Sequence, residues 1–325
     1  MEIKTAKIRE LVLKVLRKNG YDNKESEIII NSLLWAERRK STQGLTKLFG
    51  WKFEKSTEAQ SPVVSKSEDS LLVVDAQLNN HILACQLATK KLLTSVKNKP
   101  IFVAGIKNAT NSAGALGYYT AQIATAGYVA IMMSAADPGV VAYGGKTAVF
   151  GTNPISIAVP TKGDPILLDM STAALTWGDL VKYDHQSQLL PPGLAFDNQG
   201  RPTTDPKKAM DGSVTTFDKS YKSSGLALMI QILAGPLVGS LYSRNSNYCQ
   251  YGSLIIGINP QSMGDKNLFI DRVSQMIQEI KTSNKAPGFD EILLPGERGY
   301  KESKKSIMSD TIDISLELYE KIIVK

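Results

Sequence analysis

Between residues 71 and 133 the sequence alternates short apolar runs with longer stretches of helical character. Apolar runs of roughly four to eight residues are typical of buried strands, and longer stretches with turn signals at their ends are typical of helices. This alternation predicts an α/β fold with a central mixed sheet. The expected strands cover 71–75, 101–106 and 128–133, and the expected helices cover 81–96 and the residues that follow a loop at 110–114.

The N-terminal segment has a different pattern. Its apolar residues recur at the spacing of one helix face, namely Ile8, Leu11, Val12, Val15 and Leu16. Asp22 or Asn23 can cap a second helix, and a third short helix is expected around 45–49. Because 325 residues exceed the usual size of one hydrophobic core, we expect two lobes. The predicted division is a central α/β domain over 66–239 and a helical/mixed subdomain formed by 1–65 together with 240–325.

The second half of the chain contains one unusual helix. Residues 221–241 are strongly apolar and predict a buried helix that ends or bends near Gly235-Pro236 and packs at a domain or subunit interface. Before it, residues 182–220 are rich in Pro, Gly, Asp and Thr and predict a long irregular excursion. After it, we expect a strand at 253–258 and helices at 266–282 and 313–323.

The composition indicates an ordinary globular protein, with 42% hydrophobic and 21% charged residues. No window approaches the roughly 18 apolar residues of a membrane span, so no membrane association is expected. The N-terminus has no secretory apolar segment, and the two cysteines, Cys85 and Cys249, have no metal-binding or redox spacing. These features favour a cytoplasmic protein with reduced thiols.

The net charge of +7 raises the question of nucleic-acid binding. The 38 Lys and Arg are dispersed among 31 acidic residues, and the longest basic run, Arg38-Arg39-Lys40, has no aromatic interleaving. A solvated surface explains this better than a nucleic-acid interface, and we expect no nucleic-acid partner. A mild positive potential suits a small anionic ligand.

The stretch from Gly144 to Gly178 has the character of a ligand-binding segment. Its glycines allow the main chain to bend, and Thr152-Asn153-Pro154 supplies turn chemistry. The apolar runs 155–159 and 166–168 predict buried strands, and polar residues follow the second run directly. In α/β proteins ligands bind at such strand ends.

The familiar motifs of catalysis are missing from the sequence. No G-x-G-x-x-G follows an expected strand, and neither a P-loop, a G-x-S-x-G elbow nor H-E-x-x-H occurs. The two histidines, His81 and His185, lie too far apart to form a two-histidine metal helix, so no metal site is expected.

Six short motifs in order nevertheless resemble the type 2 malate/L-lactate dehydrogenase family across nearly the whole chain. They are G-Y-Y at 117–119, G-G-K with G-T-N-P at 144–154, D-M-S-T-A at 169–173, T-T-D-P at 203–206, Y-K-S-S-G-L-A-L from Tyr221, and L-P-G-E-R ending at Arg298. The resemblance implies a non-Rossmann α/β fold with a helical subdomain, a homodimer, and an NAD(P)-dependent oxidoreductase. That family includes reductases of 2-oxo acids and of cyclic imino acids, and dehydrogenases of ureidoglycolate and sulfolactate.

Carried over by position, the family's contacts to NADH or NADPH fall on three segments of the central domain and the C-terminal part. They are Leu168, Asp169, Met170, Ser171, Thr172, Ala173 and Ala174, then Lys222 and Ser223, then Gly296, Glu297 and Arg298. Hydroxyls and main-chain N–H groups suit a ribose or pyrophosphate, and the two cations suit phosphates. The alternative is that Asp169 and Ser171 cap a helix and that Lys222 is a solvated surface residue.

The residues implied for catalysis depart from the family's pattern. Where the family has S-H-G-x-x-R, this chain has Gln43 in place of the histidine and Lys47 in place of the arginine. The family's second active-site histidine corresponds to Ser112. Reduction of a ketone needs a proton from an acid, which neither glutamine nor serine supplies, whereas reduction of a protonated imine needs none. The substrate is therefore expected to be a cyclic imino acid or a 2-oxo acid served by a replacement acid.

Candidate replacement acids border the family motifs. They are Tyr118, Tyr119, Lys146, Asp137 and His81. Each has a structural alternative, since a tyrosine pair on a helix is commonly core packing, a histidine at a helix start is commonly hydrogen-bonded, and Lys146 can be a surface lysine. We take Lys146 and Tyr118 as the foremost candidates. A further alternative is a relative that binds the nucleotide without dehydrogenase activity.

Overall fold

The structure is a computed structural model that describes residues 1–49, 53–95, 99–240 and 251–324. Cys249 and the end of the expected 221–241 helix lie outside the described residues. Within them, the main sheet has seven strands in the order β2-β3-β4-β13-β5-β8-β9. The strands are β2 (Val63–Glu68), β3 (Leu71–Asp75), β4 (Ile101–Ala109), β13 (Tyr251–Ile258), β5 (Val129–Ala135), β8 (Ile155–Val159) and β9 (Ile166–Met170).

The sheet is mixed, as the alternation of apolar runs predicts. β3 and β4 run parallel, whereas the other neighbours pair antiparallel. β13 comes from the C-terminal stretch and lies between β4 and β5, so the sheet takes strands from both sides of position 240. The boundaries at 65 and 240 stay a prediction about folding units.

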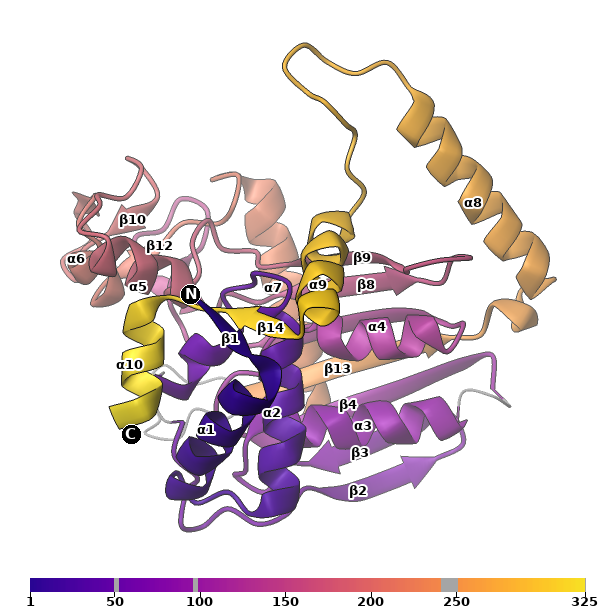
Figure 1. The fold of residues 1–325 in the computed structure, drawn as a ribbon, viewed down its shortest axis with the longest axis horizontal. Helices are drawn as coiled ribbons and strands as arrows, with labels where there is room; N and C mark the ends of the chain where they lie inside the picture. The colour runs from indigo at the N-terminus through magenta and orange to yellow at the C-terminus, as the bar shows by residue number, and fades with distance from the viewer. Residues whose placement is uncertain (50–52, 96–98, 241–250, 325) are drawn as a thin grey trace.

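Helices cover both faces of this sheet (Figure 1). On one face lie α3 (His81–Ser95) and α4 (Gly117–Thr125), whose apolar side chains pack with alternate residues of the strands, such as Leu72 and Val74 of β3. On the other face lies α7 (Tyr221–Ala234), which packs through Ile230 and Ala234 on β5 and β13.

The helix α7 is only half buried within one chain. Its outer side exposes Leu228 (41%), Met229 (50%) and Ile232 (44%). The sheet covers one side of the helix, whereas the apolar run covers its whole circumference, so packing of the outer side at an interface stays a prediction. The helix ends at Gly235, as the Gly-Pro pair predicts.

The N-terminal helices form a second hydrophobic cluster with the C-terminus. It contains α1 (Thr5–Lys18), α2 (Asn23–Glu37), the 3-10 helix η1 (Leu45–Phe49) and α10 (Leu316–Val324). β1 (Glu2–Lys4) pairs antiparallel with β14 (Thr311–Asp313), so both ends of the chain lie in this cluster. The expected 313–323 helix begins later, at Leu316, because residues 311–313 pair as a strand.

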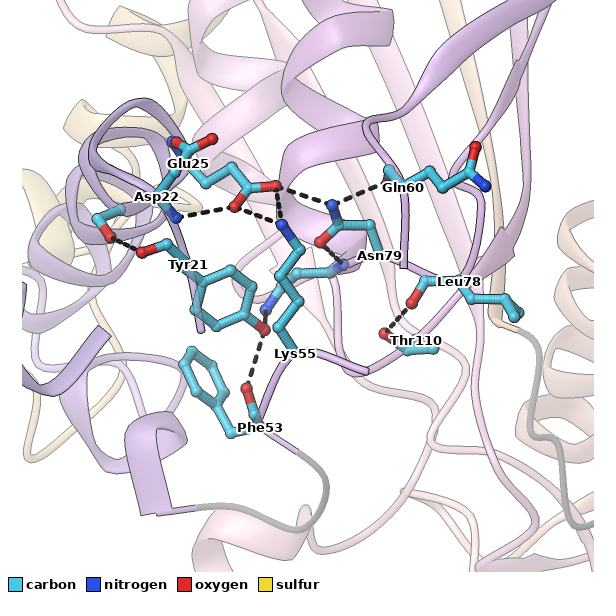
Figure 2. Close-up of polar contacts among 11 residues, drawn as sticks. Tyr21, Asp22, Glu25, Phe53, Lys55, Gln60, Leu78, Asn79 and Thr110 are labelled. Atoms are coloured by element: carbon cyan, nitrogen blue, oxygen red, sulfur yellow. Dashed lines mark hydrogen bonds and ion pairs between the residues drawn. The ribbon is translucent and has the colours of Figure 1, made fainter. Parts of the chain in front are cut away.

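Buried polar contacts attach the N-terminal helices to the main sheet (Figure 2). Glu25 of α2 accepts hydrogen bonds from Lys55 Nζ and Asn79 Nδ2, at 2.8 and 2.9 Å. Tyr21 Oη accepts from Asn80 and donates to the Phe53 carbonyl. These contacts hold the 78–80 turn, which in turn bonds to Thr110 at the end of β4. The loop that follows Thr110 thus starts from a fixed point.

Residues 182–220, expected to be an irregular excursion, belong to a segment between β5 and α7 that contains two helices and a second, small sheet. α5 (Trp177–His185) and α6 (Pro206–Met210) pack beside a small five-stranded sheet of order β11-β10-β12-β6-β7. Its strands are two or three residues long, namely β6 (Val140–Val141), β7 (Ala148–Phe150), β10 (Ala195–Phe196), β11 (Pro202–Thr203) and β12 (Ser213–Val214). Strands this short leave no periodic signal in a sequence.

The helix α8 (Lys266–Thr282) stands away from the sheet, and a long loop returns the chain to α9 (Glu297–Ser309) (Figure 1). Two 3-10 turns, η3 (Pro236–Val238) and η4 (Pro260–Ser262), end α7 and precede α8. Within the described residues, no helix is long and apolar enough to cross a membrane.

Candidate functional site

Two of the predicted catalytic residues, 65 positions apart in the chain, meet in the structure. The ammonium Nζ of Lys47 donates to Ser112 Oγ at 3.4 Å. Lys47 lies on η1, and Ser112 lies in the loop between β4 and α4. The contact brings together two positions that the resemblance implies for the substrate side of the site, and their role there stays a prediction.

Burial lowers the pKa of Lys47 to about 8. Among the described residues, no carboxylate forms an ion pair with this ammonium. A desolvated cation with no anionic partner of its own attracts a small anion. Lys47 can therefore hold a substrate carboxylate and, with a pKa near 8, can also donate a proton at neutral pH.

Gln43 lies in the loop before η1, with its main-chain N–H bonded to Ser41 Oγ. Its side-chain amide makes no hydrogen bond with the described part of the chain. The neighbouring Thr42 packs against Gly178 of α5, where a side chain on the glycine would approach Thr42 Cβ to 3.0 Å. The loop bearing Gln43 therefore abuts the segment that follows Asp169, and its free amide can bind a ligand.

Two hydrogen bonds fix the loop that bears Ser112. Ser112 Oγ accepts from the Gly114 N–H at 3.2 Å, and the buried Tyr119 donates to the Ala113 carbonyl at 2.8 Å. Tyr119 is fully buried with a satisfied hydroxyl, which confirms its structural alternative. These hydrogen bonds hold Ser112 in place, and its hydroxyl can act as a donor or acceptor to substrate.

Asp169 at the end of β9 faces α4. Its carboxylate accepts from the Gly117 N–H at 2.7 Å, and desolvation raises its pKa to about 6, against the lowering effect of that bond. Asp169 is an exposed residue, and its Oδ2 is the atom that bonds to the start of α4. Asp169 therefore joins the start of α4 to the predicted cofactor segment, as a helix cap does, while one side stays open.

The residues after Asp169 use their side chains largely within the protein. The hydroxyls of Ser171 and Thr172 both donate to the Thr152 carbonyl, at 2.9 and 3.0 Å. Ala173 pairs with Thr216 and Ala174 bonds to Thr215, so this segment runs beside the chain that leads into α7. Of the predicted contacts from 168 to 174, the main chain and Asp169 are better placed for a ligand than the hydroxyls.

The glycine-rich part before this segment is mainly structural. A Cβ at Gly151 would come within 2.5 Å of the Ala136 carbonyl oxygen, so the glycine serves chain packing. Asn153 is fully buried and donates to the Ala227 carbonyl and to Gln231 of α7. Gly151 allows the close approach to Ala136 that its sequence context predicts, and Asn153 packs against α7, so both residues pack against protein.

The second predicted cofactor element is the start of α7. Lys222 is exposed and forms no ion pair with the described residues, whereas Ser223 is buried and bonded to Asp218. Three residues after Lys222, Gly225 faces open space, since a Cβ there would meet no atom of a neighbouring segment within 4 Å. Lys222 is therefore free to meet an anion, and Ser223 supports the helix start.

The third element, 296–298, packs on the first. Gly296 lies against Leu167 of β9, and Leu167 N donates to the Pro295 carbonyl at 3.1 Å. Glu297 is paired with Lys281 and accepts from the Leu294 N–H, so its carboxylate is used within the chain. Arg298 is exposed and forms no ion pair with any described residue.

Of the four other candidate acids, three have structural partners and Lys146 lies on the surface. Burial raises the pKa of Tyr118, whose ring packs edge-on against Trp35 at 5.8 Å. His81 is fully buried, bonds to Ser253 Oγ at 3.0 Å, and has its pKa lowered to about 4 by burial, so it is neutral and structural. Asp137 accepts from Tyr251 Oη at 2.5 Å. Lys146 is exposed, packs its stem on Gly200, and bonds to no described polar group.

One residue of the site had no place in the sequence prediction. Glu37, the last residue of α2, accepts from the Leu45 N–H at 2.7 Å, and that N–H opens η1. A carboxylate is unfavourable at a helix C-terminus, which was the available signal that Glu37 has another partner.

A nicotinamide nucleotide fits the residues present. The segment from 167 to 174 touches Gly296 at one end and residues 215–217, which lead into α7, at the other. Lys222 and Arg298 offer unpaired cations for phosphates. Among the described residues, no three or more His, Cys, Asp or Glu side chains lie close enough together to hold a metal ion.

The amino-acid sequence matches one family model and is similar to several known dehydrogenases and reductases. A family model described as malate/L-lactate dehydrogenase matches residues 3–323. Malate/(S)-sulfolactate dehydrogenase of Methanothermus fervidus is 30% identical, over 97% of this chain and 94% of its own. Ureidoglycolate dehydrogenase (NAD(+)) of Escherichia coli K12 is 32% identical, over 74% and 70%. Delta(1)-pyrroline-2-carboxylate reductase 2 of Burkholderia multivorans is 29% identical, over 97% and 95%.

A solved structure has the same fold. The sulfolactate dehydrogenase of Methanocaldococcus jannaschii superposes with a TM-score of 0.83 at 28% identity, over 99% of this chain and 95% of that one. The shared fold covers the main sheet, the N-terminal helices and the C-terminal part together.

Proposed function

Since the chain belongs to the malate/L-lactate dehydrogenase family and is a nicotinamide-dependent oxidoreductase, we propose that Lys47, Gln43 and Ser112 form its substrate site. The reaction moves hydride between the nicotinamide and a C=N or C=O carbon of a small metabolite. The observation that carries the site assignment is the contact between Lys47 Nζ and Ser112 Oγ.

In this site the Lys47 ammonium pairs with the substrate carboxylate. Binding of the carboxylate restores the charge partner that the ammonium lacks, so the pKa of Lys47 rises when substrate binds. The Gln43 amide and the Ser112 hydroxyl, from two different loops, orient the group that accepts hydride. The main chain around Asp169, together with Lys222 and Arg298, would hold the nucleotide, whose nicotinamide supplies the hydride when bound.

We favour a cyclic imino acid as the substrate. Hydride addition to an iminium carbon gives a neutral amine directly, so the step needs no acid, and no imidazole occupies position 43 or 112. An imino acid gives Gln43 and Ser112 a binding role that suits their chemistry.

A second candidate, a 2-oxo acid, is favoured by one observation. The pKa of Lys47, lowered to about 8, lets its ammonium deliver the proton that an alkoxide requires. In that case one residue would both attract the substrate and protonate the product.

Turnover assays separate these proposals. Purified protein is mixed with NADH or NADPH and with Δ1-pyrroline-2-carboxylate, pyruvate or oxaloacetate, and oxidation of the nucleotide is followed by absorbance. Reduction of the imino acid that increases at lower pH supports the first proposal, and turnover of 2-oxo acids alone supports the second. Nucleotide binding without turnover of either class would overturn both and support a non-catalytic relative.

We also propose a homodimer formed through the outer face of α7. Leu228, Met229 and Ile232 form an exposed apolar strip there, and α8 carries a second set in Leu268, Met276 and Ile280. Exposed apolar side chains of this density mark association surfaces. Light scattering of the wild-type protein should give twice the chain mass, and the double variant Met229→Lys, Ile232→Lys should give one chain mass.

We propose a cytoplasmic location from the free thiol of Cys85, and cell fractionation checks it.

A further inference from the structure

One carboxylate of α2 bonds directly to the substrate loop, whose Leu45 and Leu48 are also buried in the N-terminal cluster. Glu37 Oε2 accepts from the Leu45 N–H at 2.7 Å. Leu45 is the first residue of η1, and Lys47 follows two residues later on the same short helix. Since the first N–H groups of a helix have no partner within it, the carboxylate satisfies a donor that otherwise lacks one.

Gly44 shows how closely this carboxylate is seated. A Cβ at Gly44 would collide with Glu37 Oε2 and would lie 3.1 Å from Glu37 Cα. Gly44, which follows Gln43 directly, therefore leaves room for the Glu37 side chain under the loop. Gln43 and Lys47 flank this contact on either side.

We propose that Glu37 is a positioning residue, whose carboxylate holds the loop from Gln43 to Lys47 in the conformation that binds substrate. The inference rests on the proposed function of Lys47, and it assigns Glu37 no contact with substrate. Its action passes through the Leu45 N–H to η1, and from η1 to the Lys47 side chain.

The charge of Glu37 sets the strength of its hydrogen bond to Leu45, and this charge changes near neutral pH. Desolvation, the dominant effect, raises the pKa of Glu37 to about 7. The Leu45 N–H and the Lys40 ammonium lower it, and Asp313 of β14 raises it. Lys40 Nζ bonds to Asp313 at 2.5 Å, and Asp313 also binds the N-terminal amine, so these charges largely compensate one another. Above pH 7 the carboxylate makes a charge-assisted bond to Leu45, and below it the neutral acid makes a weaker one.

The test compares three variants over a pH series. Glu37→Gln keeps an oxygen acceptor and loses the charge, Glu37→Ala loses both, and Gly44→Ala displaces the carboxylate. We expect Glu37→Gln to match the wild-type kcat/KM within about twofold at pH 6 and to be about fivefold lower at pH 8. Glu37→Ala and Gly44→Ala should raise the substrate KM about tenfold or more, with the Kd for the nucleotide unchanged.

A matched control uses the other end of α2. Asp22 also accepts from a main-chain N–H, that of Glu25 at 2.8 Å, but lies away from η1. Asp22→Asn should lower the melting temperature while leaving kcat/KM and its pH profile as in the wild type. If Asp22→Asn shifts the pH profile as Glu37→Gln does, a general stability effect explains both and the inference is overturned.

A second readout is independent of turnover. The rate at which an amine-reactive reagent modifies Lys47 in the free protein, measured by peptide mass spectrometry, reports the environment of its Nζ. We expect Glu37→Ala to change this rate severalfold while Lys146, an exposed lysine, keeps its rate. An unchanged Lys47 rate in a folded Glu37→Ala variant overturns the positioning role even if no substrate is turned over. A changed rate without turnover in the wild type would instead count against the proposed function alone.

Discussion

Replacing Lys47 by methionine should make the protein more stable and nearly inactive. The pKa of this amine falls from its ordinary value of 10.5 to about 8 in the folded protein, which corresponds to at most about 3.5 kcal/mol of desolvation. Because the folded-state pKa lies below the unfolded one, this penalty is present in full below pH 8 and disappears as the pH rises toward 10.5. Methionine fills similar space without a charge. The gain in the free energy of unfolding should therefore be largest at neutral pH.

The same substitution removes the proposed partner of the substrate carboxylate. We expect kcat/KM to fall about a hundredfold or more, since the bound carboxylate would then be buried without a cation. Urea unfolding at pH 7 and pH 10 gives the stability, and turnover at saturating nucleotide gives the activity. Lys90→Met, on the exposed side of α3, is the control and should change neither. A less stable Lys47→Met would show that the amine is not a desolvated cation, and a wild-type kcat/KM would remove Lys47 from the substrate site.

Three further substitutions concern the substrate, the nucleotide and the scaffold. Gln43→His should increase turnover of 2-oxo acids at least tenfold, because the histidine supplies an acid, and should leave imino acid reduction unchanged. Equal effects on both substrates would contradict the proposed role of position 43. Arg298→Gln should weaken nucleotide binding about tenfold in fluorescence titration, with the difference shrinking at high salt, and an unchanged Kd would remove Arg298 from the site. Asn153→Ala should lower the free energy of unfolding by about 3 kcal/mol, since two buried hydrogen bonds to α7 are lost, and a change under about 1 kcal/mol would argue against that role.

The main sheet and its helices were predictable because their signals are local. The apolar runs at 71–75 and 101–106 became β3 and β4, and the spacing of Ile8, Val12 and Val15 predicted α1. In each case burial of one face or both faces of a regular element leaves a period in the sequence. The family resemblance then predicted the shared fold as a whole.

Elements that depend on distant partners were not predictable. The β1 strand forms because residues 2–4 meet residues 311–313 at the other end of the chain. The outer face of α7 has the composition of a core and yet is exposed, because composition reports apolarity and does not report which neighbour covers it.

The site shows the same division between local and distant effects. The positions of Lys47 and Ser112 followed from short motifs, and their contact at 3.4 Å required the fold. Asn153 and Thr172 belong to those motifs as well, but both are buried, and their side chains form hydrogen bonds within the protein. A motif therefore contains both residues that hold chain segments together and residues that can face a ligand. The sequence does not distinguish the two kinds, whereas the hydrogen bonds and burial in the structure do.

The proposed site requires that Lys47, Gln43 and Ser112 face the substrate beside a nucleotide held along residues 168–174. A crystal structure of the protein with NADH or NADPH and a small carboxylate inhibitor would show whether they do. We expect the carboxylate within about 3 Å of Lys47 Nζ and the nicotinamide ring beside the Asp169 segment, with the phosphates near Lys222 or Arg298. A nicotinamide bound away from Lys47, or a carboxylate held by other residues, would contradict this assignment.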